Sequence, residues 1–107
     1  MEIKNKDIYV RRGEECALKV SVKVAGQAYS MQLGDRIQLI VKRFMLDEEK
    51  AVVSRTAIGS DVIRLKTSDT ANLACGKYRY EVRLIKSDGG VHILVEPNNF
   101  IITGGRV

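Results

Sequence analysis

The sequence predicts an all-β fold, an antiparallel β-sandwich with Greek-key topology and seven or eight strands. Apolar and polar residues alternate with a period of two along most of the 107 residues, as expected for strands with one buried and one solvated face. Turn residues separate these runs roughly every 8 to 12 residues, which is typical of sandwiches and barrels. No segment combines helical length with a helical period, so we expect almost no helix.

The first half of the chain contains four alternating segments. The first lies at residues 8–10, and the second runs from residue 16 until Gly26 ends it. Residues 29–33 form the third, and the turn Gly34-Asp35 leads into the fourth. The residues predicted to face inward are Ile8, Val10, Cys16, Leu18, Val20, Val22, Val24, Tyr29, Met31, Leu33, Ile37, Leu39 and Val41.

The second half continues the pattern. Residues 52–58 form a two-sided strand, and Gly59-Ser60 turns the chain into a strand with Ile63 and Leu65 inward. Residues 68–73, SDTANL, predict one helical turn capped by Ser68. Residues 87–90 predict a hairpin turn, after which Val91, Ile93 and Val95 should face Val82 and Leu84, with His92 outward. Pro97-Asn98-Asn99 should break the ladder before Phe100 and Ile102 close the last strand.

The stretch NLACGKYRY indicates a tyrosine corner. In Greek-key sandwiches, a tyrosine near the start of a late strand bonds backbone a few residues upstream and ties down the arch between the sheets. We expect Leu73 to plug the core from the arch, Gly76 to let the chain bend, and Tyr78 to bond backbone within residues 68–73. The alternative is that Tyr78 is a plain core aromatic.

The bulk composition predicts one soluble domain spanning residues 1–107, with mobile ends at 1–6 and 104–107. No apolar run approaches the ~20 residues of a membrane span, and the first residues lack the apolar core of a signal peptide. The net charge of +5 favours an anionic partner, but the cations are spread along the chain. Cys16 and Cys75 form no CxxC pair, and we expect them to be buried, reduced and unpaired.

Three stretches together resemble a known family. VRRGEECALKVSV is a glycine–acid turn followed by an alternating strand, AYSMQLGDRIQLIVKR is a strand, turn and strand, and GKYRYEVRLIKSDGGVHILVEPNNFIIT is the tyrosine strand with its Asp-Gly turn and two further strands. Their order resembles the immunoglobulin-like β-sandwich domain at the N-terminus of phage baseplate upper proteins, and related small prophage structural proteins. The chain departs from that pattern at Leu33-Gly34-Asp35, where the family usually has Thr-Gly-Ala. The resemblance implies an oligomeric component of a phage tail, baseplate or fibre, present in the bacterial cytoplasm during assembly and then in the virion.

The sequence contains no recognisable catalytic set, so we expect a non-enzymatic protein without metal or cofactor. The single histidine, His92, is interpreted as a solvated strand residue, and the acidic cluster at residues 47–49 as a charged loop tip. A zinc site needs about four ligands, which two separated cysteines and one histidine do not supply.

Phe44, Met45 and Leu46 are consecutive where a strand should run into a loop. Either the strand bulges and the core takes two of them, or the hairpin tip carries an apolar patch that docks on a partner protein or a second copy. Other phage structural proteins, or copies of the chain itself, are therefore the expected partners. Two alternatives remain: an OB-like barrel binding single-stranded nucleic acid, and a generic immunoglobulin-like module binding carbohydrate or protein. Nucleic acid is not expected, because Tyr78 and Tyr80 alternate with the cations and so lie on the opposite face.

Overall fold

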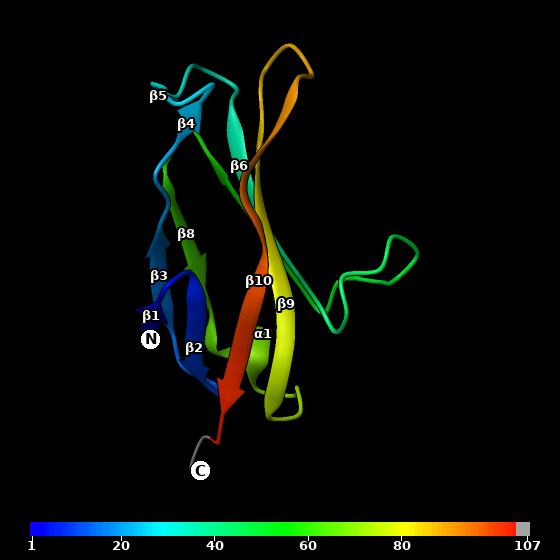
Figure 1. Cartoon of the computed structure of the whole chain (residues 1–107). Coiled ribbons are helices and arrows are strands. Elements are labelled where there is room, and N and C mark those ends of the chain that lie inside the picture. Colours follow the sequence, from blue (N-terminus) through cyan, green and yellow to red (C-terminus); the bar gives the residue numbers. More distant parts are fainter. Residues whose placement is uncertain (105–107) are drawn as a thin grey trace.

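The computed structural model describes residues 1–104 and contains two sheets that share one core (Figure 1). A six-stranded sheet has the order β1-β2-β10-β9-β6-β7, a two-stranded sheet consists of β3 and β8, and β4 and β5 form a small hairpin. Strand accounts for 54% of the chain and helix for 4%, which confirms the all-β prediction. The elements are β1 (Glu2–Lys4), β2 (Asp7–Arg11), β3 (Cys16–Lys19), β4 (Lys23–Val24), β5 (Gln27–Ala28), β6 (Arg36–Lys42), β7 (Val53–Ile58), β8 (Val62–Leu65), α1 (Thr67–Thr70), β9 (Gly76–Ile85) and β10 (Val91–Thr103).

The strand pairing differs from the purely antiparallel expectation at one place. β2 runs parallel to β10, with Phe100 opposite Ile8 and Ile102 opposite Val10. The two strands are far apart in the sequence, so no hairpin forces them to be antiparallel. The described residues contain ten strands rather than seven or eight. The segment predicted to run from residue 16 to Gly26 is divided into β3 and β4, residues 29–33 form no strand, and β1 and β5 are short pairings that were not predicted.

The shared core is built from the inward-facing set that the alternation predicts. Ile37, Leu39 and Val41 on β6 are fully buried, and Leu18, Ile63 and Leu65 bring the two-stranded sheet against them. Burial of such side chains stabilises the fold by roughly 1.5–3 kcal/mol each. The prediction for Leu33 is wrong. It lies in the turn before β6, outside any strand, and is 98% exposed.

The register of the β9–β10 hairpin also corrects the prediction. Its connection is Lys86–Gly90, one residue longer than expected, and it closes with the Lys86 amide donating to the Gly90 carbonyl at 2.7 Å. Val91 therefore pairs with Ile85, and Val91 and Ile93 lie on the outer face instead of facing the core. His92 pairs with Leu84, so its expected outward direction is wrong as well.

Strand β10 is continuous through Pro97, where a break was expected. Register shifts between Ile93 and Val95, and between Val95 and Asn98, absorb the irregularity. The first shift turns Val95 back toward the core, where it packs half-buried. β-Bulges of this kind let a strand change the direction of its side chains without ending the ladder.

The remaining predictions concern the helical turn and the two ends. Helix α1 starts one residue before Ser68, and its N-cap is Lys66, whose amide donates to the Asp69 carboxylate at 2.7 Å. At the N-terminus, Glu2–Lys4 pair with β2 as strand β1. Mobility of the two ends stays a prediction, and residues 105–107 lie outside the described residues. No helix within residues 1–104 has the length and apolar character needed to cross a bilayer.

Candidate functional site

The connection between β6 and β7, residues 43–52 and hereafter the β6–β7 loop, projects away from the two sheets (Figure 1). Phe44 is 68% and Leu46 61% exposed, and Met45 is half-buried with a left-handed φ of 59°. None of the three belongs to the core. The interpretation in which the core takes two of them is therefore wrong, and the loop carries two large apolar side chains in solvent.

Glu49 gives this loop its shape. Its carboxylate accepts hydrogen bonds from the Phe44 amide at 3.0 and 3.1 Å and from the Leu46 amide at 3.1 Å. Burial raises the pKa of the Glu49 carboxyl, but hydrogen bonds from the Leu46, Phe44 and Arg43 amides outweigh it and hold the pKa below its usual value. Lys42 adds a bond from its ammonium to the Leu46 carbonyl at 3.0 Å. Within the acidic cluster at residues 47–49, Glu49 thus holds the backbone of the loop.

The base of the β6–β7 loop meets the predicted corner residues. The Tyr78 hydroxyl donates to the Ala74 carbonyl at 2.8 Å, one residue after the segment in which the partner was expected. Leu73 packs half-buried against the core, and Gly76 has a φ of 143°, which side-chain-bearing residues rarely adopt. The Arg43 guanidinium lies 4.8 Å from the centre of the Tyr78 ring, a distance typical of a cation–π contact.

A buried carboxylate that the sequence indicates only as a turn residue organises the opposite end of the sheet. Asp35 is 1% exposed and accepts hydrogen bonds from the Tyr29 hydroxyl at 2.6 Å and from the Gln32 and Ser87 amides at 2.8 Å. These donors lower the pKa of its carboxyl, the Tyr29 hydroxyl contributing most. The Asp35 carbonyl also accepts the Gly59 amide at 2.8 Å. One residue therefore joins three connections, namely its own between β5 and β6, the β7–β8 turn and the β9–β10 turn.

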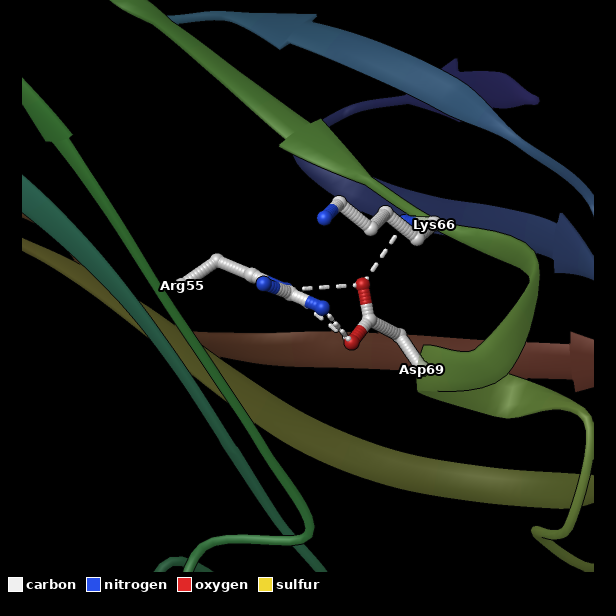
Figure 2. A network of polar contacts seen from close by, with 3 residues as sticks. All are labelled: Arg55, Lys66 and Asp69. Carbon is white, nitrogen blue, oxygen red and sulfur yellow. Dashed lines mark hydrogen bonds and ion pairs between the residues drawn. The ribbon is translucent and has the colours of Figure 1, made fainter.

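A second polar cluster joins the two sheets (Figure 2). Arg55 on β7 donates hydrogen bonds to the carboxylate of Asp69 in α1. Its Nε lies 2.9 Å from Oδ1 and 2.8 Å from Oδ2, and its Nη2 lies 2.5 Å from Oδ1. Burial raises the pKa of the Asp69 carboxyl, but hydrogen bonds from Arg55 and the Lys66 amide outweigh burial, so the pKa lies below its usual value. The acceptor sites of Asp69 are thus occupied by structural donors. The cluster fastens α1, which follows β8, to the edge of the six-stranded sheet.

Further exposed apolar residues lie on the outer face of the six-stranded sheet. Ile58 on β7 is 72% exposed, Val91 54% and Ile93 49%. Cross-strand pairing places Ile85 and Arg36 between Ile58 and Val91. Sequence reasoning missed this strip because it assigned Val91 and Ile93 to the core. The alternation contained no signal for it, since a one-residue difference in turn length inverts both faces.

Several hollows indent the surface of residues 1–104, and two of them meet at Lys19, Val20 and Ser21. The larger, of about 870 Å³, is lined by Lys19, Val20, Ser21, Val22, Tyr29, Ser30, Met31, Gly59, Ser60 and Asp61. The smaller, of about 370 Å³, lies between the two sheets and is lined by Ile3, Lys6, Ile8, Leu18, Lys19, Val20, Ser21, Lys23, Tyr80, Val82, Leu94 and Val95. The second has the more apolar wall, and all its charged lining residues are lysines.

The cysteines and the histidine form no cluster in the described part of the chain. Cys16 and Cys75 are both free thiols. Cys75 is exposed on the arch before β9, so the expectation that both thiols are buried is wrong for it. Burial raises the pKa of the half-buried Cys16 thiol. Among residues 1–104, no three His, Cys, Asp or Glu side chains gather where they could hold a metal ion.

No protein-family model, no curated protein and no solved structure matches the chain.

Proposed function

We propose that the protein is a non-enzymatic protein–protein interaction module that docks through the β6–β7 loop. The observation that carries the proposal is the pair Phe44 and Leu46, exposed on a projecting loop whose backbone is held by Glu49. Apolar and aromatic anchors of this kind supply most of the binding energy in protein interfaces. A loop already ordered before binding loses less conformational entropy when the partner docks.

The finer proposal is an immunoglobulin-like, Greek-key sandwich that serves as an assembly component of a phage or prophage particle. The Tyr78–Ala74 hydrogen bond and the parallel pairing of the first and last long strands support the sandwich topology. The phage assignment rests on the resemblance of the strand and turn order. It implies a homo-oligomer or contacts with other tail, baseplate or fibre proteins, in the bacterial cytoplasm and then in the virion.

Single-stranded nucleic acid is the weaker candidate. Tyr78 and Tyr80 are 5% and 3% exposed, so neither ring can stack on a base. Single-strand binding normally combines a basic groove with aromatic stacking platforms.

The proposal is tested by the mass of the protein in solution, measured by light scattering across a concentration series. We expect self-association that Phe44→Asp combined with Leu46→Asp abolishes, with the strand content unchanged by circular dichroism. Leu33→Asp is the matched control, because Leu33 is 98% exposed but lies in a different connection. We expect this control to associate like the unchanged protein.

Two outcomes contradict the proposal. An oligomer that survives the double substitution would place the contact elsewhere, most simply on the outer strip at Ile58, Val91 and Ile93. A monomer at every concentration would remove the homo-oligomer. The phage assignment has its own check, since the neighbouring genes should encode tail or head proteins, and metabolic neighbours would remove its support.

A further inference from the structure

We propose that the free edge of β3 and the adjoining 370 Å³ hollow together bind an extended segment of a partner protein, with alternating apolar and acidic residues, as an added strand. The proposal does not depend on the β6–β7 loop, and it assigns a second contact with a different chemistry. Three independent features of the structure carry it: an unpaired strand edge, an apolar slot beside that edge, and a rim of lysines.

The first feature is the edge itself. In the described part of the chain, β3 pairs with β8 on one side and with no strand on the other. The Val20 amide donates to the Asp61 carbonyl at 2.8 Å, toward the β8 side. Because backbone groups alternate in direction along an antiparallel strand, those of Ala17 and Lys19 point to the open side. Such a row of unpaired donors and acceptors is a template for another strand.

The second feature is the hollow beside this edge. Its wall combines Leu18 of β3 and Val20, which follows β3 directly, with Ile8 of β2 and Val82 of β9, all of them nearly fully buried. Leu94 and Val95 of β10, both half-buried beside a register shift, and the exposed Ile3 also belong to the apolar part of the wall. Every second side chain of a strand added to β3 would face this wall, as in other recognition by strand addition.

The third feature is charge. Lys6, Lys19 and Lys23 are the charged residues of the lining, all three are exposed, and no acidic residue contributes to the wall. Side chains on the outward face of the added strand would lie beside Lys19, where carboxylates are favoured and further cations are repelled. The open backbone edge favours a peptide over a free amphiphilic anion, which would leave the backbone groups of Ala17 and Lys19 unpaired.

The test uses an end-blocked heptapeptide, EVEVEVE, titrated into isotope-labelled protein and followed by NMR. We expect saturable shifts of the Ala17 and Lys19 amide signals, slowed hydrogen exchange at both, and no change in the β6–β7 loop. The peptide KVKVKVK should not bind. The same acidic peptide with N-methylated backbone amides should bind at least about tenfold more weakly, because strand addition depends on main-chain hydrogen bonds.

Two protein variants probe the two halves of the site. Ala17→Pro removes one edge-facing donor, and edge strands tolerate proline where the amide faces solvent. Lys19→Glu combined with Lys23→Glu reverses the charge at two of the three lysines in the lining. Its control is Lys50→Glu combined with Lys77→Glu, which changes the net charge equally but alters exposed lysines outside the lining. We expect each site variant to weaken the peptide Kd about tenfold or more, and the control to stay within about twofold.

Three results would overturn the inference. The first is equal binding of the N-methylated peptide. The second is equal weakening by the control lysine pair, which would indicate only a diffuse positive field. The third is binding of dodecanoate in the hollow together with no effect of the peptide on Ala17 and Lys19, which would assign the slot to an amphiphilic anion.

If Ala17→Pro does not fold, the lysine pairs and the N-methylated peptide still decide the question. Light scattering of the Phe44→Asp and Leu46→Asp variant tests the loop proposal separately.

Discussion

The β9–β10 turn and the β6–β7 loop both connect neighbouring strands of the same sheet, and each is organised by a carboxylate. The carboxylate at the β9–β10 turn is the buried Asp35, which comes from a different part of the chain and reaches the Ser87 amide. The carboxylate in the β6–β7 loop is Glu49, which is half-buried and bonds only to amides of its own loop.

The difference lies in what each carboxylate connects. Asp35 fastens Tyr29 and Gln32 of its own connection, together with the distant Ser87, to the start of β6, so its full set of bonds can form only when the β9–β10 turn is in place. Glu49 bridges residues three to five positions away and can do so with little help from the rest of the fold. The first connection belongs to the stability of the whole domain, and the second gives local shape to a loop that is free to meet a partner.

The largest effect should follow from Asp35→Asn. The amide keeps one acceptor oxygen and turns an NH₂ group toward backbone donors, leaving buried N–H groups unpaired. We expect a lower thermal midpoint, measured by circular dichroism, than for Tyr78→Phe or Glu49→Gln. Leu33→Asp, two residues away and exposed, is the matched control and should keep the original midpoint. An unchanged midpoint in Asp35→Asn would contradict the central role of this carboxylate.

Acid should produce the next largest effect. Asp35 has a folded-state pKa below its ordinary value of 3.8, so the unfolded chain binds protons first as the pH falls. The stabilisation is therefore fully present above about pH 4 and is lost as the pH falls through the folded pKa. Thermal midpoints measured from pH 7 to pH 2 should decline in this range. The decline should be shallower in Asp35→Asn, and equal slopes would contradict the assignment.

Tyr78→Phe should have a moderate effect, because Tyr78 lies where the base of the β6–β7 loop meets the core. The substitution removes the hydroxyl that bonds the Ala74 carbonyl and leaves the ring and its contact with Arg43. We expect a loss of about 1 kcal/mol in the free energy of unfolding, measured by urea denaturation. No change in the midpoint would mean that Tyr78 acts only as a core aromatic.

Glu49→Gln should have the smallest effect on stability and a clear local one. The loop loses a charged acceptor for the Phe44 and Leu46 amides, so their hydrogen exchange should accelerate several-fold while the thermal midpoint stays unchanged. Exchange at the Ser87 amide serves as the internal control, because Asp35 holds it independently of the loop. Equal acceleration at Ser87 would mean that the two connections are coupled after all.

The period-two alternation was sufficient to predict the β6 core residues and the all-β class, because burial of one face requires it. The alternation did not bear on the corner, which rested on the spacing of Leu73, Gly76 and Tyr78, and whose acceptor is the Ala74 carbonyl, one residue beyond the expected segment. It failed at Val91 and Ile93, where the length of one turn inverts the faces of the strand. It failed at Leu33 for a related reason, because alternation beyond the end of a strand has no structural meaning.

The apolar triplet at residues 44–46 was visible in the sequence as a violation of alternation, and so was the choice between bulge and patch. Only the tertiary structure excluded uptake of these side chains by the core, because the exposure of Phe44 and Leu46 depends on where the rest of the core ends.

Asp35, the β3 edge and the lysine rim had no sequence signal of their own. Local composition determines which face of a strand is apolar, since that preference acts through each residue and its near neighbours. Which strands pair, which edge stays open and which carboxylate reaches the distant Ser87 amide depend on contacts between residues far apart in the chain. Those contacts exist only after the sheets have packed, so the tertiary structure alone determined them.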